Sequence, residues 1–131
     1  MKDASLSLGT KVEAIVFDFD GTIADTRSLI LSCFRAAYDR LGLQTPSDER
    51  IASTIGLPLE RAFRELSGLN EDEGKRAAEA YRTVFRSLGA ARVEAIGGMP
   101  AVVTRCAQAG YRLAVASSRG HESLQALLPA L

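Results

Sequence analysis

Cysteine and histidine are scarce in this sequence, and long apolar runs are missing. The chain of 131 residues has only two cysteines, Cys33 and Cys106. Both lie in apolar helical patterns, so we expect reduced core residues and neither a disulfide nor a metal pair. No apolar run approaches the roughly 20 residues of a membrane span, and the first residues lack the apolar core of a secretory signal. We therefore expect a cytoplasmic protein without a membrane partner.

An excess of charge of either sign is also missing. The 16 basic and 16 acidic side chains give a formal net charge of zero, which offers no attraction for nucleic acid or an anionic membrane. The single histidine, His121, stands at the start of an expected helix and is predicted to be a surface or capping residue. The composition, 47% hydrophobic and 24% charged, is that of one globular domain, or of a domain with an insertion.

Helical periodicity dominates the chain between residues 25 and 94. Apolar residues recur at helical spacing, and the expected helices cover residues 26–41, 46–54, 59–66 and 70–88. Gly42 is placed to end the first of them. Asn70 and Glu73 have the spacing of an N-cap and its reciprocal partner. No strand is expected here, so the pattern predicts an all-helical unit.

Two short strands flank this unit. Residues 14–17, Ala-Ile-Val-Phe, form a continuous apolar run typical of a short buried strand, and residues 111–116 form a second one. Pro100 is placed near the start of a helix over residues 101–109, and a further helix is expected over residues 121–128.

This order of elements predicts an α/β fold. It favours a partial Rossmann-like parallel sheet as the core, with the helical unit inserted after the first strand as a cap. We assign residues 1–25 and 95–131 to this incomplete core and residues 26–94 to the cap.

The most informative motif follows the first strand, where Asp18 and Asp20 precede Gly21 and Thr22. The carboxyl end of a strand is where open α/β sheets bind ligands, and residues two apart in an extended segment share a face. Two close carboxylates repel each other, which a divalent cation or a shared proton relieves. Asp and Gly are also frequent in plain turns, and calcium loops begin similarly, but the third ligand and the later glutamate of a calcium loop are missing.

Residues 17–26, Phe-Asp-Phe-Asp-Gly-Thr-Ile-Ala-Asp-Thr, resemble the first motif of the haloacid dehalogenase-like (HAD) superfamily. The likeness is to its phosphoglycolate phosphatase-like branch, which has a helical cap. The resemblance implies that Asp18 is a nucleophile forming an aspartyl-phosphate and that Asp20 is the acid and base. It also implies Mg²⁺, bound by Asp18 and by Asp20 through its backbone carbonyl. The implied function is a Mg²⁺-dependent phosphatase that hydrolyses a small phosphorylated metabolite such as phosphoglycolate.

Ser117 ends the second strand and is the next candidate residue. A hydroxyl and backbone N–H groups at that position can hold a phosphate oxygen against Asp18. The strand and its Ser117-Ser118 end are similar to the second motif of the superfamily, which implies phosphate binding by both serines and by Gly21 and Thr22. A Ser-Ser-Arg-Gly loop is also a plain turn.

The sequence departs from the superfamily in its second half. Members carry a lysine in a third motif and acidic residues in a fourth, whereas this chain has no lysine after Lys75 and no aspartate after Asp72. We therefore expect a chain that is truncated before both motifs. A two-strand core would leave a strand edge and apolar helix faces uncovered. The alternative to the phosphatase is thus an inactive HAD-like remnant that serves as a binding or interaction module.

Within the cap, Ile55–Leu59 resembles the segment that faces the active site in phosphoglycolate phosphatase-like proteins, and we predict that it determines substrate specificity. Three arginines near the motifs could bind a carboxylate or phosphate of the substrate. We favour the simpler interpretation that they lie on solvated helix faces, where Glu60 and Arg64 have the i,i+4 spacing of an ion pair. The three arginines are Arg27, Arg61 and Arg64.

Overall fold

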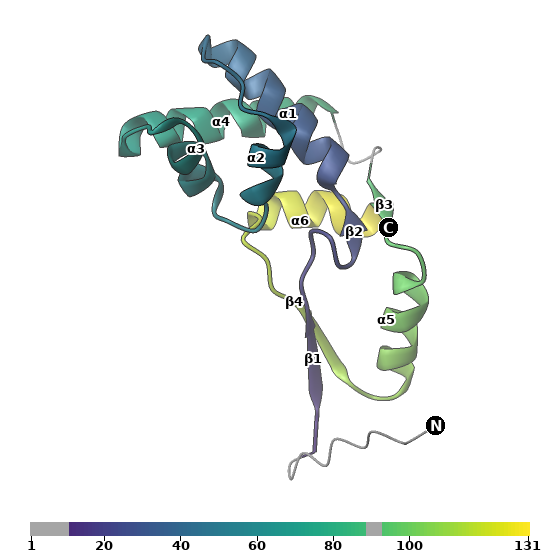
Figure 1. Ribbon diagram of the computed structural model, residues 1–131. Helices are drawn as coiled ribbons and strands as arrows, with labels where there is room; N and C mark the ends of the chain where they lie inside the picture. Colours follow the sequence, from purple (N-terminus) through teal and green to yellow (C-terminus); the bar gives the residue numbers. More distant parts are fainter. Residues whose placement is uncertain (1–10, 89–92) are drawn as a thin grey trace.

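The centre of the core is a parallel pair of strands. In this computed structural model, which describes residues 11–88 and 93–131, β1 (Ala14–Phe17) pairs with β4 (Arg112–Val115). The register sets Ala14 opposite Arg112 and Phe17 opposite Val115. Helix α5 (Met99–Gln108) leads into β4 and begins at a proline in its first turn, as predicted. Figure 1 shows the two strands below the helices, with α5 beside them.

Four helices follow the first strand and form the predicted all-helical unit (Figure 1). They are α1 (Arg27–Leu41), α2 (Asp48–Ser53), α3 (Leu59–Ser67) and α4 (Glu71–Leu88). Helix α4 packs against both α1 and α3. Their shared core contains four aromatic side chains grouped around Phe63, with the closest ring centroids, of Phe34 and Phe63, 4.6 Å apart. The other two are Tyr38 and Tyr81.

Local signals end and begin these helices where the sequence predicts. Gly42 follows α1 with a φ of 65°, a left-handed conformation that glycine adopts without a Cβ clash. Ahead of α4, the Glu73 N–H donates to Asn70 Oδ1 and the Asn70 N–H donates to Glu73 Oε2, both at 2.9 Å. The predicted capping box is confirmed.

A small antiparallel ribbon joins the two parts of the chain and was not predicted. Strand β2 (Ala24–Asp25) pairs with β3 (Glu94–Ala95), and the Ile96 N–H donates to the Ile23 carbonyl at 2.8 Å. Strands of two residues show no alternation, so the sequence carried no signal for them. We propose this ribbon as the boundary between core and cap.

The predicted burial of β1 is wrong. Its residues alternate between exposed and half-buried, and the side chain of Val16 is 61% exposed. An apolar run specifies a strand that can be buried, but burial needs a covering layer on each face. Within the described residues the sheet has two strands, and no residue of α5 is buried. Within the described residues, β1 and α5 therefore leave apolar side chains exposed, Val16 and Val102 among them.

The end of the chain returns to the helical unit. Helix α6 (His121–Leu127) and the 3₁₀ turn Leu128–Ala130 lie below α1 and α4 in Figure 1, and Leu127 is fully buried in the main core. Both cysteines are free thiols. Cys33 is buried as predicted, whereas Cys106 is only half-buried. Among the described helices, none combines the length and the apolar composition that crossing a membrane requires.

Candidate active site

The aspartate motif forms a tight loop between β1 and β2. The carbonyl of Phe19 accepts hydrogen bonds from three successive N–H groups, at 3.0 to 3.2 Å: those of Thr22, Ile23 and Ala24. Gly21 has a φ of 75°, so the turn requires a residue without a Cβ. The Phe19 side chain is fully buried and anchors the loop. Because Phe19 packs in the main core, the backbone of the neighbouring Asp20 is fixed relative to the helical unit.

Asp18 and Ser117 follow the paired ends of neighbouring strands. Phe17 lies opposite Val115, and the Ala116 N–H donates to the Phe17 carbonyl at 2.9 Å. Asp18, one residue past Phe17, and Ser117, two residues past Val115, therefore lie at the same edge of the sheet, as predicted. Asp18 is exposed, and its Oδ1 accepts the Phe19 N–H at 2.8 Å. Its other carboxylate oxygen has no hydrogen bond among the described residues.

Asp20 is held by two side chains from separate parts of the chain. Its Oδ1 accepts the Thr26 hydroxyl at 2.6 Å and Nη2 of Arg119 at 2.6 Å, and its Oδ2 accepts Nε of Arg119 at 3.3 Å. The side chains of Asp20 and Arg119 are only 12% and 8% exposed. A guanidinium thus offsets the Asp20 charge, where the sequence predicted a divalent cation or a shared proton.

Arg119 is the site residue that the sequence analysis missed. Besides Asp20 it binds Ser123, whose Oγ accepts Nη1 at 2.9 Å. Its guanidinium carbon lies 5.6 Å from the ring centroid of Phe85 and 5.9 Å from that of Phe19. One feature of the sequence could have identified it: Arg119 lies in the loop after the second expected strand, at the sheet edge where the two aspartates were expected.

The predicted phosphate-binding residues have partners of their own. Ser117 Oγ accepts the Arg119 N–H at 3.1 Å, and the Ser118 hydroxyl donates to the Leu57 carbonyl at 3.5 Å. The Gly21 N–H donates to the Ala24 carbonyl at 2.9 Å, and the Thr22 N–H is used within the loop. A phosphate would have to compete for the Gly21 and Thr22 N–H groups and the Ser118 hydroxyl, whereas the Ser117 hydroxyl only accepts here and can still donate. The role of these residues in binding a phosphate stays a prediction.

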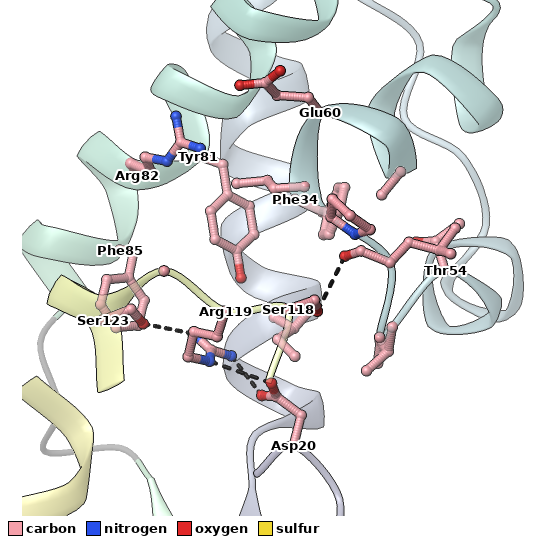
Figure 2. A pocket seen from close by; sticks show the side chains of 18 of the residues that line it. Asp20, Phe34, Thr54, Glu60, Tyr81, Arg82, Phe85, Ser118, Arg119 and Ser123 are labelled. Atoms are coloured by element: carbon pink, nitrogen blue, oxygen red, sulfur yellow. Dashed lines mark hydrogen bonds and ion pairs between the residues drawn. The ribbon is translucent and has the colours of Figure 1, made fainter. Parts of the chain in front are cut away.

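A pocket of about 710 Å³ lies between the helical unit and the loop after β4. Its inner end reaches Asp20, two residues beyond Asp18. Figure 2 shows Asp20 and Arg119 at one end, Tyr81 and Phe34 in the middle, and Glu60 at the other end. The Ser118 to Leu57 hydrogen bond links the two sides.

The predicted specificity segment, Ile55–Leu59, lines this pocket. His121 also lines it and is exposed, as expected of a surface residue. The expected ion pair of Glu60 with Arg64 does not form within the described residues. Arg61 instead pairs with Glu65, from Nε to Oε1 at 2.8 Å. Arg64 packs its side chain against Gly74, and the exposed Arg27 opens α1.

Burial raises the pKa of two side chains, that of Tyr81 in the pocket lining and that of the buried Cys33. Desolvation is the largest cause and raises the pKa of the Tyr81 phenol, although nearby Arg119 opposes the shift. Desolvation likewise raises the pKa of the Cys33 thiol to about 11. Both groups therefore stay protonated at neutral pH, and Tyr81 presents a neutral hydroxyl on the Arg119 side of the pocket.

The donor atoms at the motif suit a hard cation. Within residues 11–88 and 93–131 no three side chains of His, Cys, Asp or Glu come together as a metal site. Mg²⁺ is usually held by one or two carboxylates together with waters and substrate phosphate. The exposed Asp18 carboxylate and the Asp20 backbone carbonyl are oxygen donors of that kind, so the residues present fit Mg²⁺.

The family model of haloacid dehalogenase-like hydrolases matches residues 15–131. The chain belongs to this family.

Two curated relatives and one solved structure illustrate its place there. "Probable phosphatase IndB" of Dickeya dadantii (strain 3937) is 40% identical over 121 residues, with 88% of this chain and 52% of that protein covered. The 5'-nucleotidase of Pseudomonas aeruginosa is 33% identical over 119 residues, with coverages of 91% and 52%. A haloacid dehalogenase-like protein from Bacteroides fragilis has a TM-score of 0.85 at 27% identity, covering 91% of this chain and 57% of that one. The chain spans about half the length of the curated relatives it matches.

Proposed function

We propose that this chain carries the nucleophile and the acid of a Mg²⁺-dependent phosphomonoester hydrolase. One observation carries the proposal: Asp18 stands at the sheet edge beside Ser117, two residues from an Asp20 that Thr26 and Arg119 hold in place. Family membership and the names of the two curated relatives described above support phosphate ester hydrolysis as the reaction class.

The proposed reaction has two steps at phosphorus. A carboxylate oxygen of Asp18 forms a bond to phosphorus while the ester P–O bond breaks, and Asp20 donates a proton to the leaving alcohol oxygen. Water then attacks the aspartyl-phosphate, Asp20 takes the water proton, and phosphate leaves with Asp18 restored. Asp20 Oδ1 has two close donors, whereas Oδ2 has one at 3.3 Å. In the proposed first step Oδ2 holds the proton and gives up the Arg119 Nε hydrogen bond that the ionised Asp20 accepts in the structure.

Thr26 and Arg119 are positioning residues in this scheme, because they fix Asp20 without touching the phosphorus. Ser117 and Ser118, with Gly21 and Thr22, are the proposed phosphate donors. Mg²⁺, bound by the Asp18 carboxylate and the Asp20 carbonyl, would offset the negative charge of nucleophile and phosphate.

The proposed partner is a small phosphorylated metabolite. The resemblance noted in the sequence names phosphoglycolate as a first candidate, whereas one relative is named for 5'-nucleotides. The cytoplasmic location inferred from the sequence stays a prediction.

Phosphate release from phenyl phosphate, with and without Mg²⁺, tests the proposal. We expect turnover that depends on Mg²⁺ and falls by at least about a thousandfold in Asp18→Asn, because the nucleophile is removed. Asp39→Asn is the matched control, since Asp39 is an exposed aspartate on α1. Equal losses in both variants, or turnover that survives in Asp18→Asn, would contradict the assignment.

The second candidate is a non-catalytic binding module. The exposed apolar side chains on the sheet and α5, with Val16 61% and Val102 43% exposed, favour it. Absence of any Mg²⁺-dependent turnover in the correctly folded chain would support this candidate over the enzyme.

A further inference from the structure

The pocket above Asp20 is lined mainly by apolar side chains. Helices α1 and α4 contribute buried aromatic side chains, and the 55–59 segment contributes half-buried aliphatic ones. We name six of them the apolar wall: Phe34, Ile55, Leu57, Leu59, Tyr81 and Phe85. The half-buried members have surface left to cover, so a ligand that contacts them removes apolar area from water.

The volume of the pocket exceeds the needs of a very small alcohol group. At about 710 Å³ it lies within the usual range of sites for whole organic ligands. A two-carbon acid such as glycolate would leave most of the apolar wall in contact with water.

The cations that line the pocket already have acidic partners. Arg119 binds Asp20, and Nη1 of Arg82 lies 3.6 Å from Glu79 Oε2. Arg86 lies 3.3 Å from Glu79 and 3.7 Å from Glu122. Three acidic residues of the lining, Asp20, Glu60 and Glu122, also balance these three arginines. The described pocket therefore offers a second negative charge on the substrate no net attraction, which favours an uncharged group over an acid.

From its inner end outward, the pocket passes from the charged Asp20 and Arg119 to the aromatic rings of Tyr81 and Phe34. Figure 2 shows the Tyr81 ring with its hydroxyl toward Arg119, whose guanidinium lies between that hydroxyl and Asp20, so the ring begins the apolar part of the pocket beyond the ion pair. A phosphate held at the aspartate loop would therefore direct the rest of its ester along the apolar wall.

We propose that the substrate is a phosphomonoester whose alcohol part is an uncharged, flat and largely apolar group, such as an aromatic or heterocyclic ring. This inference rests on the proposed function and names its substrate class. It assigns Leu57 and Leu59 as specificity-determining residues.

Two phosphonates that differ only beyond the CH₂ group test the proposal by binding. Benzylphosphonate ends in a phenyl ring and phosphonoacetate in a carboxylate, and neither can be hydrolysed. Titration calorimetry with the full chain and Mg²⁺ should give a Kd for benzylphosphonate at least about tenfold lower, because the ring covers the apolar wall. An equal or higher Kd for benzylphosphonate would overturn the proposal.

Variants locate the preference in the pocket. Leu57→Asn should weaken benzylphosphonate about fivefold and change phosphonoacetate less than about twofold. Leu43→Asn is the matched control, because Leu43 is 39% exposed and does not line this pocket. Leu59→Asn serves if Leu57→Asn does not fold, as judged by circular dichroism. Equal weakening of both phosphonates would overturn the specificity role.

Kinetic measurements on two esters distinguish a failure of the proposed substrate class from a failure of the proposed phosphatase function. A higher kcat/KM for benzyl phosphate than for phosphoglycolate supports both. Hydrolysis of both esters with equal kcat/KM keeps the phosphatase and overturns the substrate class. Tighter binding of benzylphosphonate without hydrolysis of either ester supports the ligand class and overturns the phosphatase.

Discussion

The helical unit and the two-stranded sheet differ greatly in how far they bury their apolar side chains. In the helical unit, Tyr38, Ile51 and Phe63 are fully buried. In the sheet region, Val16 is 61% exposed and α5 has no buried residue. Four helices can bury their apolar faces against one another, whereas a sheet needs a layer on each face. The described burial therefore places most of the packing stability of this chain in the helical unit, whereas the site proposed above lies at the sheet edge.

The largest effect that tests this comparison is expected at Phe63. Truncation to alanine removes a fully buried ring that touches Phe34, Tyr38 and Tyr81, and should cost about 3–5 kcal/mol of unfolding free energy. Tyr111→Ala, at an exposed aromatic beside β4, should cost less than about 1 kcal/mol. Urea unfolding followed by circular dichroism measures both. Similar losses would show that the sheet region is as important for stability as the helices.

The next effect compares two ion pairs that both link the N-terminal strand region to the β4 region. Arg119→Met leaves the nearly buried Asp20 without its guanidinium, which should cost about 3 kcal/mol. Arg112→Met breaks a pair with Glu13 whose side chains are 83% and 66% exposed, and should have almost no effect. Arg119→Lys should restore only part of the loss, since an ammonium cannot bind both oxygens in a fork. Unfolding by urea gives the values, and an equal effect of the two methionine variants contradicts the comparison.

A smaller effect is expected at the capping box of α4. Asn70→Ala removes the acceptor for the Glu73 N–H and should lower the unfolding free energy by about 1 kcal/mol. Asn70→Asp keeps the acceptor and should stay within about 0.3 kcal/mol of the parent. Loss of stability in both variants would mean that the side chain acts in some other way than as a cap.

The smallest effect at neutral pH concerns the two thiols. The pKa of Cys33 is raised by burial to about 11, so its protonated form favours the folded state. That contribution is complete below pH 9, the ordinary value, and is lost as the pH rises through about 11. Cys33→Ala should therefore flatten the fall in stability between pH 9 and about 11 and leave the pH dependence near pH 7 unchanged. Thiol labelling at pH 8 should modify the half-buried Cys106 well before Cys33, and the reverse order would contradict the buried position.

Local signals allowed the sequence to predict much of the fold. Gly42, the capping box of Asn70 and Glu73, and Pro100 at the start of α5 act through neighbouring residues, so their effect can be recognised without the tertiary structure. The parallel pairing of β1 with β4 also followed from the order of elements. The exposure of Val16 did not, because it depends on which elements cover the sheet.

The candidate site was predictable where its residues belong to a motif, as Asp18, Asp20 and Ser117 do. Asp18 and Asp20 stand two residues apart, whereas Arg119 reaches Asp20 from 99 residues further along the chain. A contact of that kind has no local pattern. The sequence therefore indicated two carboxylates that need a counter-charge, and the structure identified the guanidinium that supplies it to Asp20.

The central claim is that Asp18 is the nucleophile at the exposed sheet edge, and trapping the covalent intermediate tests it most directly. Brief incubation of the chain with Mg²⁺ and benzyl phosphate, followed by borohydride, would reduce an acyl phosphate at Asp18 to homoserine. Peptide mass spectrometry should then find the change at Asp18, and no such change at Asp20 or Asp25. No reduced residue, or reduction at another aspartate, would contradict the claim.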